Sequence, residues 1–236
     1  PRQVAAILTT RVSMSANVMK RSYMSYTHHH GAKLFTRLAK EREAAIAPGD
    51  FPLDQDLQCY VIGSVYCSVG FMEAFINEVF QDAHDNSPSR IAAFTPGAHG
   101  VMLGIWALSE EDGKHSKTLS KYQLALRLAG QTEFLKGEDP YQSAALLIEL
   151  RNFLTHYKPK SLGIGEAGKH EVYELESKLT GRFASNPHMQ GTGNSWFPDK
   201  AIGLGMAEWA LKSSRGLVNS FIQRVGMDVD YGSETV

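Results

Sequence analysis

Apolar residues recur at helical spacing along most of the chain, and the alternating pattern of a half-buried strand is almost absent. Between about residues 14 and 46, apolar positions such as Leu34 and Leu38 lie among charged ones and a Pro-Gly pair follows, which predicts one long helix. The stretch from about 53 to 83 contains no proline and is apolar on most sides, so we expect it to be the central helix. Its small residues should let neighbouring helices come close. They are Gly63, Ser64, Cys67, Ser68 and Gly70.

Turn-forming residues divide the remainder of the chain into shorter helical segments. The segment from about 139 to 157 opens on an Asp-Pro pair that suits a helix N-terminus, and Pro159 should stop it. The other segments predicted as helical cover about 101–108, 116–129, 170–183 and 197–224. No repeat and no linker divides the sequence. The pattern therefore predicts a single all-α domain over residues 1–236, a helical bundle with long loops.

The composition is that of an ordinary globular chain. The 236 residues include 24 Lys and Arg against 25 Asp and Glu, for a net charge of -1, and 43% are hydrophobic. These values exclude a disordered chain and a polybasic coat for nucleic acid, although they leave room for a local basic patch. Cys59 and Cys67 would lie about 12 Å apart on one helix, too far for a disulfide, so we expect two buried thiols.

The longest uncharged stretches are poor candidates for a membrane span. Residues 57–72 are fewer than the about 20 that a spanning helix needs, and residues 91–109 are interrupted by Pro96. The apolar run near the start of the chain is soon followed by Arg11 and Lys20, unlike a secretory leader. The sequence therefore favours a soluble protein of the cytoplasm over a membrane protein.

Motifs for several common chemistries are missing, among them CxxC, HExxH, ExxH, the complete P-loop and the GxSxG nucleophile turn. The run His28–His30 offers metal-ligating side chains, but consecutive helical residues point about 100° apart, so we expect solvated histidines and no metal site. Gly163, Gly165 and Gly168 follow a predicted helix and not a strand, which favours a flexible loop over a phosphate cradle. We expect no cofactor.

One polar cluster stands out in an otherwise apolar helix. Arg151 is followed directly by Asn152 and, five residues after the arginine, by His156. On a helix Arg151 and Thr155 share one face while Asn152 and His156 share the next, so the four predict one continuous polar patch. An arginine is followed by a histidine after a similar spacer at two other places, with six residues between Arg21 and His28 and five between Arg182 and His188, against four here. Only the first cluster has an amide beside the arginine and lies late in an apolar helix.

This cluster resembles the signature of the HEPN superfamily, in which a polar residue directly follows an arginine and a histidine comes after a short spacer. The segment 68–80, SVGFMEAFINEVF, resembles an early helix of the same superfamily. The resemblance implies an all-α fold and an endoribonuclease that needs no metal. It also implies a homodimer in which two Arg/His motifs face one cleft, with toxins and phage-defence proteins as the natural setting.

The resemblance also implies roles for single residues. Arg151 would stabilise the charge that develops on the phosphate, His156 would transfer a proton or hold the phosphate, and Asn152 would orient one of them. Glu73 and Asn77, four residues apart on the predicted central helix, would align Arg151. The residues expected to contact RNA are Thr155, Lys158 and Lys160.

The expected partners are an RNA substrate and a second copy of the chain, with an antitoxin or neighbouring protein as a further candidate. The residues leave one alternative open. An arginine and a histidine near a helix end often only bond to carbonyls within a bundle. The chain would then be a noncatalytic helical module that binds RNA, a nucleotide or a protein.

Overall fold

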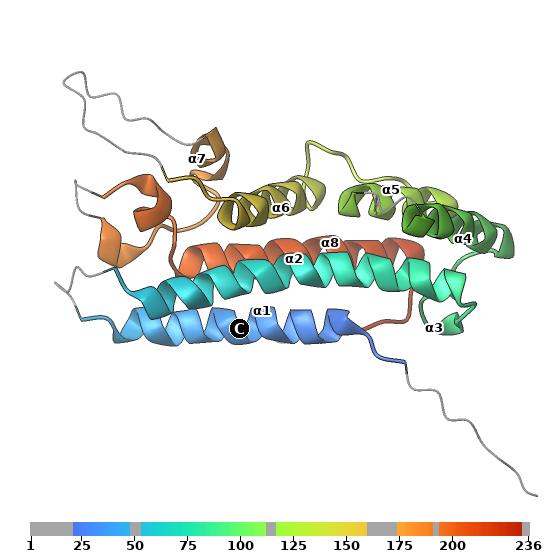
Figure 1. Cartoon of the computed structure of the whole chain (residues 1–236), viewed down its shortest axis with the longest axis horizontal. Helices are drawn as coiled ribbons and strands as arrows, with labels where there is room; N and C mark the ends of the chain where they lie inside the picture. Colours follow the sequence, from blue (N-terminus) through green and yellow to red (C-terminus); the bar gives the residue numbers. More distant parts are fainter. Residues whose placement is uncertain (1–20, 48–52, 112–116, 160–173, 191–193, 233–236) are drawn as a thin grey trace, which may run out of the picture.

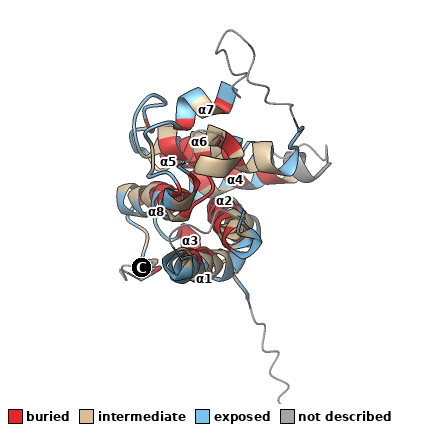
Figure 2. Ribbon diagram, turned by 90° about the vertical axis from the view of Figure 1, so that its left-hand side faces the viewer, coloured by how far each residue is buried: buried red, intermediate tan, exposed pale blue. Residues whose placement is uncertain are grey.

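A computed structural model describes residues 21–47, 53–111, 117–159, 174–190 and 194–232. All regular structure within these residues is helical, so the predicted all-α class is confirmed. Three long helices run side by side: α1 (Met24–Ala45), α2 (Gln55–His84) and α8 (Leu204–Val225). Three shorter helices follow one another along a fourth side: α4 (Pro96–Glu111), α5 (Thr118–Leu128) and α6 (Tyr141–Thr155) (Figure 1). Viewed along the bundle, the row of short helices and the three long helices surround one core (Figure 2).

α2 is the central helix that its sequence predicts. Asp54 caps its first turn by accepting a hydrogen bond from the Leu57 backbone N–H at 2.8 Å. The side chains of Phe71, Phe75 and Phe80 are fully buried. α2 contacts both other long helices and each helix of the α4–α6 row. The whole bundle therefore packs on α2.

α1 packs antiparallel against α2 through small residues. A Cβ atom added to Gly31 of α1 would lie 2.9 Å from the Cys67 Sγ, and one added to Gly70 of α2 would lie 2.8 Å from the His28 Nδ1. Such distances are shorter than van der Waals contact, so a larger side chain at either glycine would force the two helices apart. The predicted close approach of helices at the small residues of α2 is confirmed here.

α1 begins at Met24, so the prediction of a helix from about residue 14 is wrong at residues 21–23, while residues 14–20 lie outside the described chain. Tyr23 is extended, and its hydroxyl donates to the Asp82 Oδ2 of α2 at 3.0 Å. The Arg21 guanidinium also binds the Asp82 carboxylate, at 2.6 Å. These contacts hold the chain across the far end of α2, away from the helical path.

The C-terminal helix begins at Leu204, later than the predicted residue 197. Residues Trp196–Lys200 form a separate turn, and Gly203 is extended, which interrupts the helical path between the two. The Leu204 backbone N–H donates to the Glu43 carboxylate of α1 at 2.8 Å, so an acidic side chain lies at the positive end of α8. The remaining short helices are α3 (Pro88–Ile91), α7 (Glu174–Leu179) and the 3-10 turn Pro187–Met189.

The two cysteines are unpaired, but the expectation that both are buried is wrong, because Cys59 is exposed and Cys67 is half-buried. Tyr66, two turns further along the same face of α2 as Cys59, is 38% exposed. We call this strip, from Cys59 to Tyr66, the open side of α2.

By length and composition, α2 is the one helix of the described chain that could cross a membrane, and half of its most apolar stretch is buried inside the bundle. The central helix of a large core has the same pattern. The position of α2 at the centre of the bundle therefore accounts for its apolar length and composition.

Acid should destabilise the bundle through His29 of α1. His29 is 4% exposed and its Nε2 has no hydrogen-bond partner, so the expectation of solvated histidines is wrong at this position. Burial, with the nearby positive charges of Arg215 and Lys33, lowers the His29 pKa from 6.5 to about 4. The unfolded chain then binds a proton first as the pH falls below 6.5, and the free energy of unfolding drops until the pH reaches about 4. We expect a loss of up to about 3 kcal/mol across this window.

The measurement is urea unfolding from pH 7 to pH 4. His29→Leu should flatten the pH dependence, since it removes the titrating group. His30→Leu, at an exposed position one residue further along α1, should leave the dependence unchanged. Equal slopes for wild type and His29→Leu would contradict the assignment.

Candidate functional site

The polar cluster of the sequence lies at the C-terminal end of α6. The start of this helix is held by Asp139, whose Oδ1 accepts from the Ser143 backbone N–H at 3.2 Å and from its hydroxyl at 2.6 Å. Leu147 and Leu150 are fully buried, on the side of α6 that packs on α2 and α8. With its apolar side fixed in this way, α6 presents the polar end at the surface.

α6 ends at Thr155 and not at residue 157 as predicted. His156 is the first residue beyond the helix, with φ -110 and ψ 31, and its backbone N–H donates to the Asn152 carbonyl at 3.0 Å. The α-helical argument that Asn152 and His156 share a face therefore holds only approximately. The His156 side chain is exposed.

Arg151 is held from two sides. Its Nη2 donates to the Glu73 Oε1 of α2 at 2.8 Å, and its Nη1 reaches the other Glu73 oxygen at 3.5 Å. Its Nε donates to the Asn152 Oδ1 at 2.9 Å. The Arg151 side chain is 24% exposed and that of Glu73 33% exposed. The structure therefore brings together Arg151, Asn152 and Glu73. Glu73 contacts Arg151, as expected for a residue that aligns this arginine.

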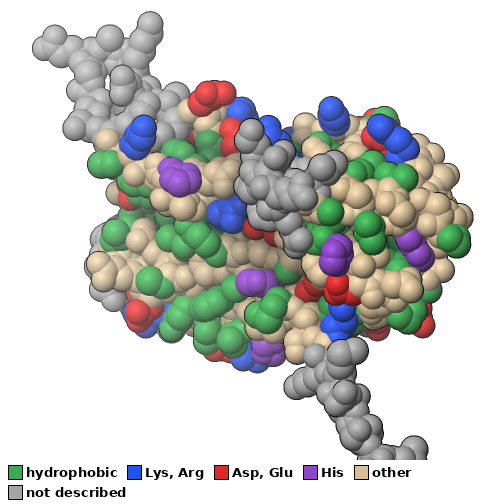
Figure 3. Space-filling view, turned by 45° about the vertical axis from the view of Figure 1, so that its right-hand side comes forward, with side chains coloured by type: hydrophobic (Ala, Val, Ile, Leu, Met, Phe, Trp, Pro, Cys, Tyr) green, Lys and Arg blue, Asp and Glu red, His purple; other side chains and the backbone are tan. Residues whose placement is uncertain are grey.

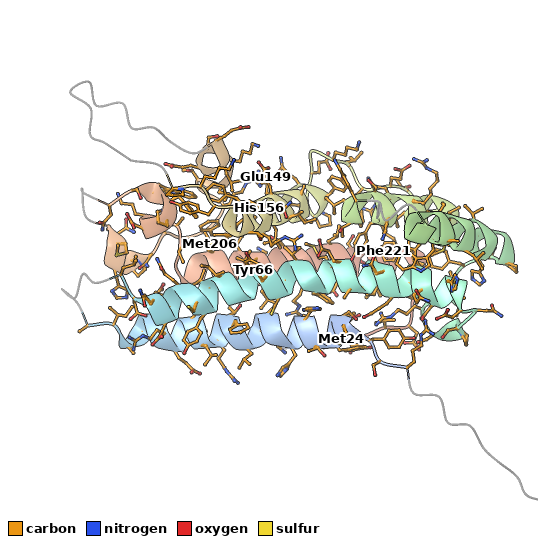
Figure 4. All side chains as sticks on the ribbon, in the orientation of Figure 1. Met24, Tyr66, Glu149, His156, Met206 and Phe221 are labelled. Atoms are coloured by element: carbon orange, nitrogen blue, oxygen red, sulfur yellow. The ribbon has the colours of Figure 1, made fainter. Side chains whose placement is uncertain are left out.

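Thr155 connects the cluster to α2. Its hydroxyl donates to the Arg151 carbonyl at 2.8 Å, which uses its single hydrogen. The Tyr66 hydroxyl of α2, 2.8 Å from the same Thr155 oxygen, must then be the donor in that pair. Figure 4 shows Tyr66 on α2 and His156 at the end of α6 on the same side of the molecule.

The other predicted site residues lie apart from Arg151 or outside the described chain. The Asn77 Oδ1 accepts from the Lys121 Nζ of α5 at 2.8 Å, so Asn77 binds Lys121 and not Arg151. Lys158 is exposed just after the helix end, and Lys160 lies outside the described residues, as do Gly163, Gly165 and Gly168.

The contact between Glu73 and Arg151 belongs to a series of three. Glu73, Asn77 and Gln81 recur every four residues along one face of α2, and each binds a donor from a different covering helix. The three pairs are Glu73 with Arg151 of α6, Asn77 with Lys121 of α5, and Gln81 with Trp106 of α4. We call this series the α2 polar ladder. It fixes the order and the axial position of the short helices on α2.

Lys121 is a charged residue that the sequence does not single out. Its side chain is 3% exposed, and its Nζ lies 4.6 Å from the centre of the Trp106 ring. Burial lowers the pKa of Lys121, and the negative charge of Glu73 opposes this effect. Glu73 therefore lies close to two cations, Arg151 and Lys121. A lone lysine within the predicted helix 116–129 carries no spacing signal that could have identified it.

The cluster lies on an open surface. Three cavities of about 320 to 380 Å³ lie along α8, and none of them is lined by Arg151, Asn152 or His156. Among the described residues, no group of three His, Cys, Asp or Glu side chains has the arrangement of a metal site. On the face drawn in Figure 3, the Lys and Arg side chains are scattered between hydrophobic patches and form no continuous stripe. The site could therefore bind a flexible chain along its surface more readily than a small enclosed ligand.

The chain matches no known family model, no curated protein and no solved structure. The residues themselves, and the resemblance of the Arg151 cluster, therefore carry the functional argument.

The Glu73–Arg151 pair should contribute measurably to stability. Because both side chains are partly exposed, we expect a coupling free energy of about 1 kcal/mol in a double-mutant cycle with Glu73→Ala and Arg151→Ala. The measurement is chemical unfolding of wild type, both single variants and the double variant. The exposed pair of Lys178 and Glu149, 2.7 Å apart, is the matched control and should give a smaller value. Equal coupling in both cycles would mean that the Glu73 contact does not position Arg151.

Proposed function

We propose that this protein is a metal-independent endoribonuclease whose site is formed by Arg151, Asn152 and His156. The observation that supports this best is that the Arg151 side chain is both held by hydrogen bonds and partly exposed. Its guanidinium is held by Glu73 and Asn152, it remains partly exposed, and the exposed His156 follows five residues later, just past the end of the same helix. Such an arrangement suits a cation that stabilises charge on a bound phosphate.

Arg151 keeps hydrogen-bonding capacity for a ligand. A guanidinium has five N–H groups, and three of those of Arg151 donate to Glu73 and Asn152. The two others, one on each Nη, can donate to phosphate oxygens. The negative Glu73 fixes the cation without using these two donors, which makes Glu73 a positioning residue.

His156 is the group that can move a proton. In the proposed reaction the ribose 2′-oxygen attacks the adjacent phosphorus and loses its proton, the bond from phosphorus to the 5′-oxygen breaks, and that oxygen gains a proton. The products are a 2′,3′-cyclic phosphate and a 5′-hydroxyl. A histidine near neutral pH can carry out either proton transfer. Lys158 and Thr155, next to it in sequence, would contact the RNA.

One chain contributes one histidine to this site, whereas the reaction uses one group that accepts a proton and one that donates it. A homodimer in which two α6 ends face each other would provide both. The setting implied by the resemblance is a cytoplasmic toxin or phage-defence protein, with an antitoxin or a neighbouring protein as partner.

One observation favours the alternative of a noncatalytic binding or assembly module. Arg151 is one of three donors of the α2 polar ladder, and the other two have purely structural surroundings. In that case Arg151 would dock α6 on α2, and the polar surface would bind RNA or a protein without cutting it.

Activity measurements separate the two functions. His156→Ala should lower the rate of RNA cleavage by about 10² to 10⁴-fold, the usual contribution of a positioned acid or base. Arg151→Ala should act similarly, and Arg151→Lys should recover only part of the rate because lysine lacks the planar fork. The assay is gel analysis of labelled RNA in EDTA, with the product ends identified by mass spectrometry.

Matched controls come from the same chain. His30→Ala changes an exposed histidine on α1 and should leave the rate near wild type. Arg182→Ala removes an arginine that binds Gln142 and should do the same. If no RNA is cut by wild type, or if His156→Ala cuts as fast, the nuclease proposal is wrong. If Arg151→Ala unfolds the protein while His156→Ala has no effect, the binding module is the better function.

The shared site also predicts the assembly state. Light scattering at micromolar concentration should give about twice the chain mass of 26.0 kDa. Fully active protein that elutes at the mass of one chain would contradict a site completed by a second copy.

A further inference from the structure

Two exposed tyrosines lie next to residues of the Arg151 cluster. In the described part of the chain eight large hydrophobic side chains are exposed, and three of these are tyrosines: Tyr26, Tyr66 and Tyr157. Tyr66 bonds to Thr155, and Tyr157 directly follows His156. Two of the three exposed tyrosines therefore border the proposed catalytic residues.

The Tyr66 ring is fixed in orientation. Its hydroxyl donates to Thr155, and Thr155 is bonded in turn to the backbone of Arg151. Tyr66 as a whole is 38% exposed, although it lies on the central helix of the bundle. The contact crosses from α2 to α6 and holds the ring on the open side of α2.

The Tyr157 ring is held by aromatic neighbours. It meets the Phe153 ring edge to face, with centroids 5.7 Å apart, and lies 6.0 Å from the Phe197 ring. Phe153 also packs on Phe197 at 4.8 Å. The Tyr157 ring is nevertheless 40% exposed. Two rings, one from α2 and one from the chain leaving α6, are thus held in place while part of each remains open to solvent.

We propose that Tyr66 and Tyr157 bind unpaired bases of a single-stranded RNA by stacking, on either end of the segment that carries Thr155 and His156. This inference rests on the proposed function, because RNA must reach Arg151 for the bases to meet the rings. Aromatic rings bind bases through their faces with little regard for sequence. Rings that are already ordered lose little conformational entropy when a base binds.

Single-stranded RNA fits this surface better than a duplex. In a duplex the bases are stacked on one another, and their faces are closed to protein side chains. Proteins that bind the backbone of a duplex commonly do so through a continuous row of basic side chains. The described residues form no such row on the face drawn in Figure 3. The tyrosines would therefore make the enzyme selective for loops, ends and other unpaired regions.

The test measures binding without cleavage. The protein is the full chain with His156→Ala, and the probe is a fluorescein-labelled 12-nucleotide RNA of mixed sequence, alone or annealed to its complement, in EDTA. Fluorescence anisotropy should show that Tyr66→Ala and Tyr157→Ala each weaken binding of the single strand by about 5- to 150-fold. Tyr66→Phe keeps the ring but loses the bond to Thr155 that orients it, so it should bind more weakly than the parent and more tightly than Tyr66→Ala. The duplex should bind weakly and with no dependence on either tyrosine.

Tyr26→Ala is the matched control, since it removes an exposed tyrosine of α1 and should leave binding unchanged. Tyr66→Leu and Tyr157→Leu keep apolar volume without an aromatic face, so they give the answer if an alanine variant fails to fold. Binding of the leucine variants equal to the parent would overturn the stacking proposal, and so would a duplex bound as tightly as the single strand.

The outcomes also separate this inference from the nuclease itself. If wild type cuts RNA through His156 but the tyrosine variants bind normally, stacking is wrong and the nuclease stands. If the tyrosine variants weaken binding but wild type cuts no RNA, the stacking proposal is supported and the protein is a binding module, not a nuclease. If the parent binds no single-stranded RNA, the stacking proposal fails with the RNA assignment.

Discussion

Burial of α2 is the constraint on which the rest of the structure depends. A helix of thirty residues is about 45 Å long, and this one contacts α1, α3, α4, α5, α6 and α8. Its polar residues must therefore find partners on those helices, because a buried polar group without a partner costs about 1–3 kcal/mol. The α2 polar ladder meets this demand on one side, with one donor from each short helix. It also gives the three short helices a unique position on α2, which apolar packing alone specifies less sharply.

The same demand is met at the far end of α2 by a second cluster. Arg90 of α3 is 2% exposed, binds Glu78 at 2.9 Å and lies 4.4 Å from the centre of the Tyr23 ring. Four aromatic rings lie around this cation, and its Nε and Nη1 have no hydrogen-bond partner. Arg151 differs in one respect, since its guanidinium is anchored in the same way but a quarter of the side chain stays in solvent. Structural and catalytic roles for Arg151 are therefore compatible, because the anchor uses one set of donors and leaves another set open.

The central helix was the most predictable part of the fold, because a long apolar stretch without proline admits few other structures. The ends of helices were less predictable. The start of α1 depends on Tyr23 and Arg21 binding Asp82, more than fifty residues away in sequence, and local pattern contains no trace of that contact. The start of α8 depends in the same way on Glu43. In the candidate site, the helical spacing of Glu73 correctly suggested a partner for Arg151, whereas Asn77 faces Lys121 because α5, and not α6, covers that turn of α2.

Because the Arg151 cluster lies at a helix end, Arg151 is held in place while His156 is exposed to solvent. Arg151 lies in the last turn of α6, where Glu73 and the buried leucines hold it, while His156 lies one residue beyond the helix and is exposed. Had α6 continued to residue 157, the histidine would remain within the helix, on the same face as Asn152. In the proposed site, the end of the helix at Thr155 would let the histidine approach a phosphate. The Thr155–Tyr66 contact ties the last turn of α6, and with it the backbone of Arg151, to α2. The contact that orders the helix end is thus also the one that orients the exposed Tyr66 ring, so a single hydrogen bond couples the geometry of Arg151 to the surface that we propose for the bases.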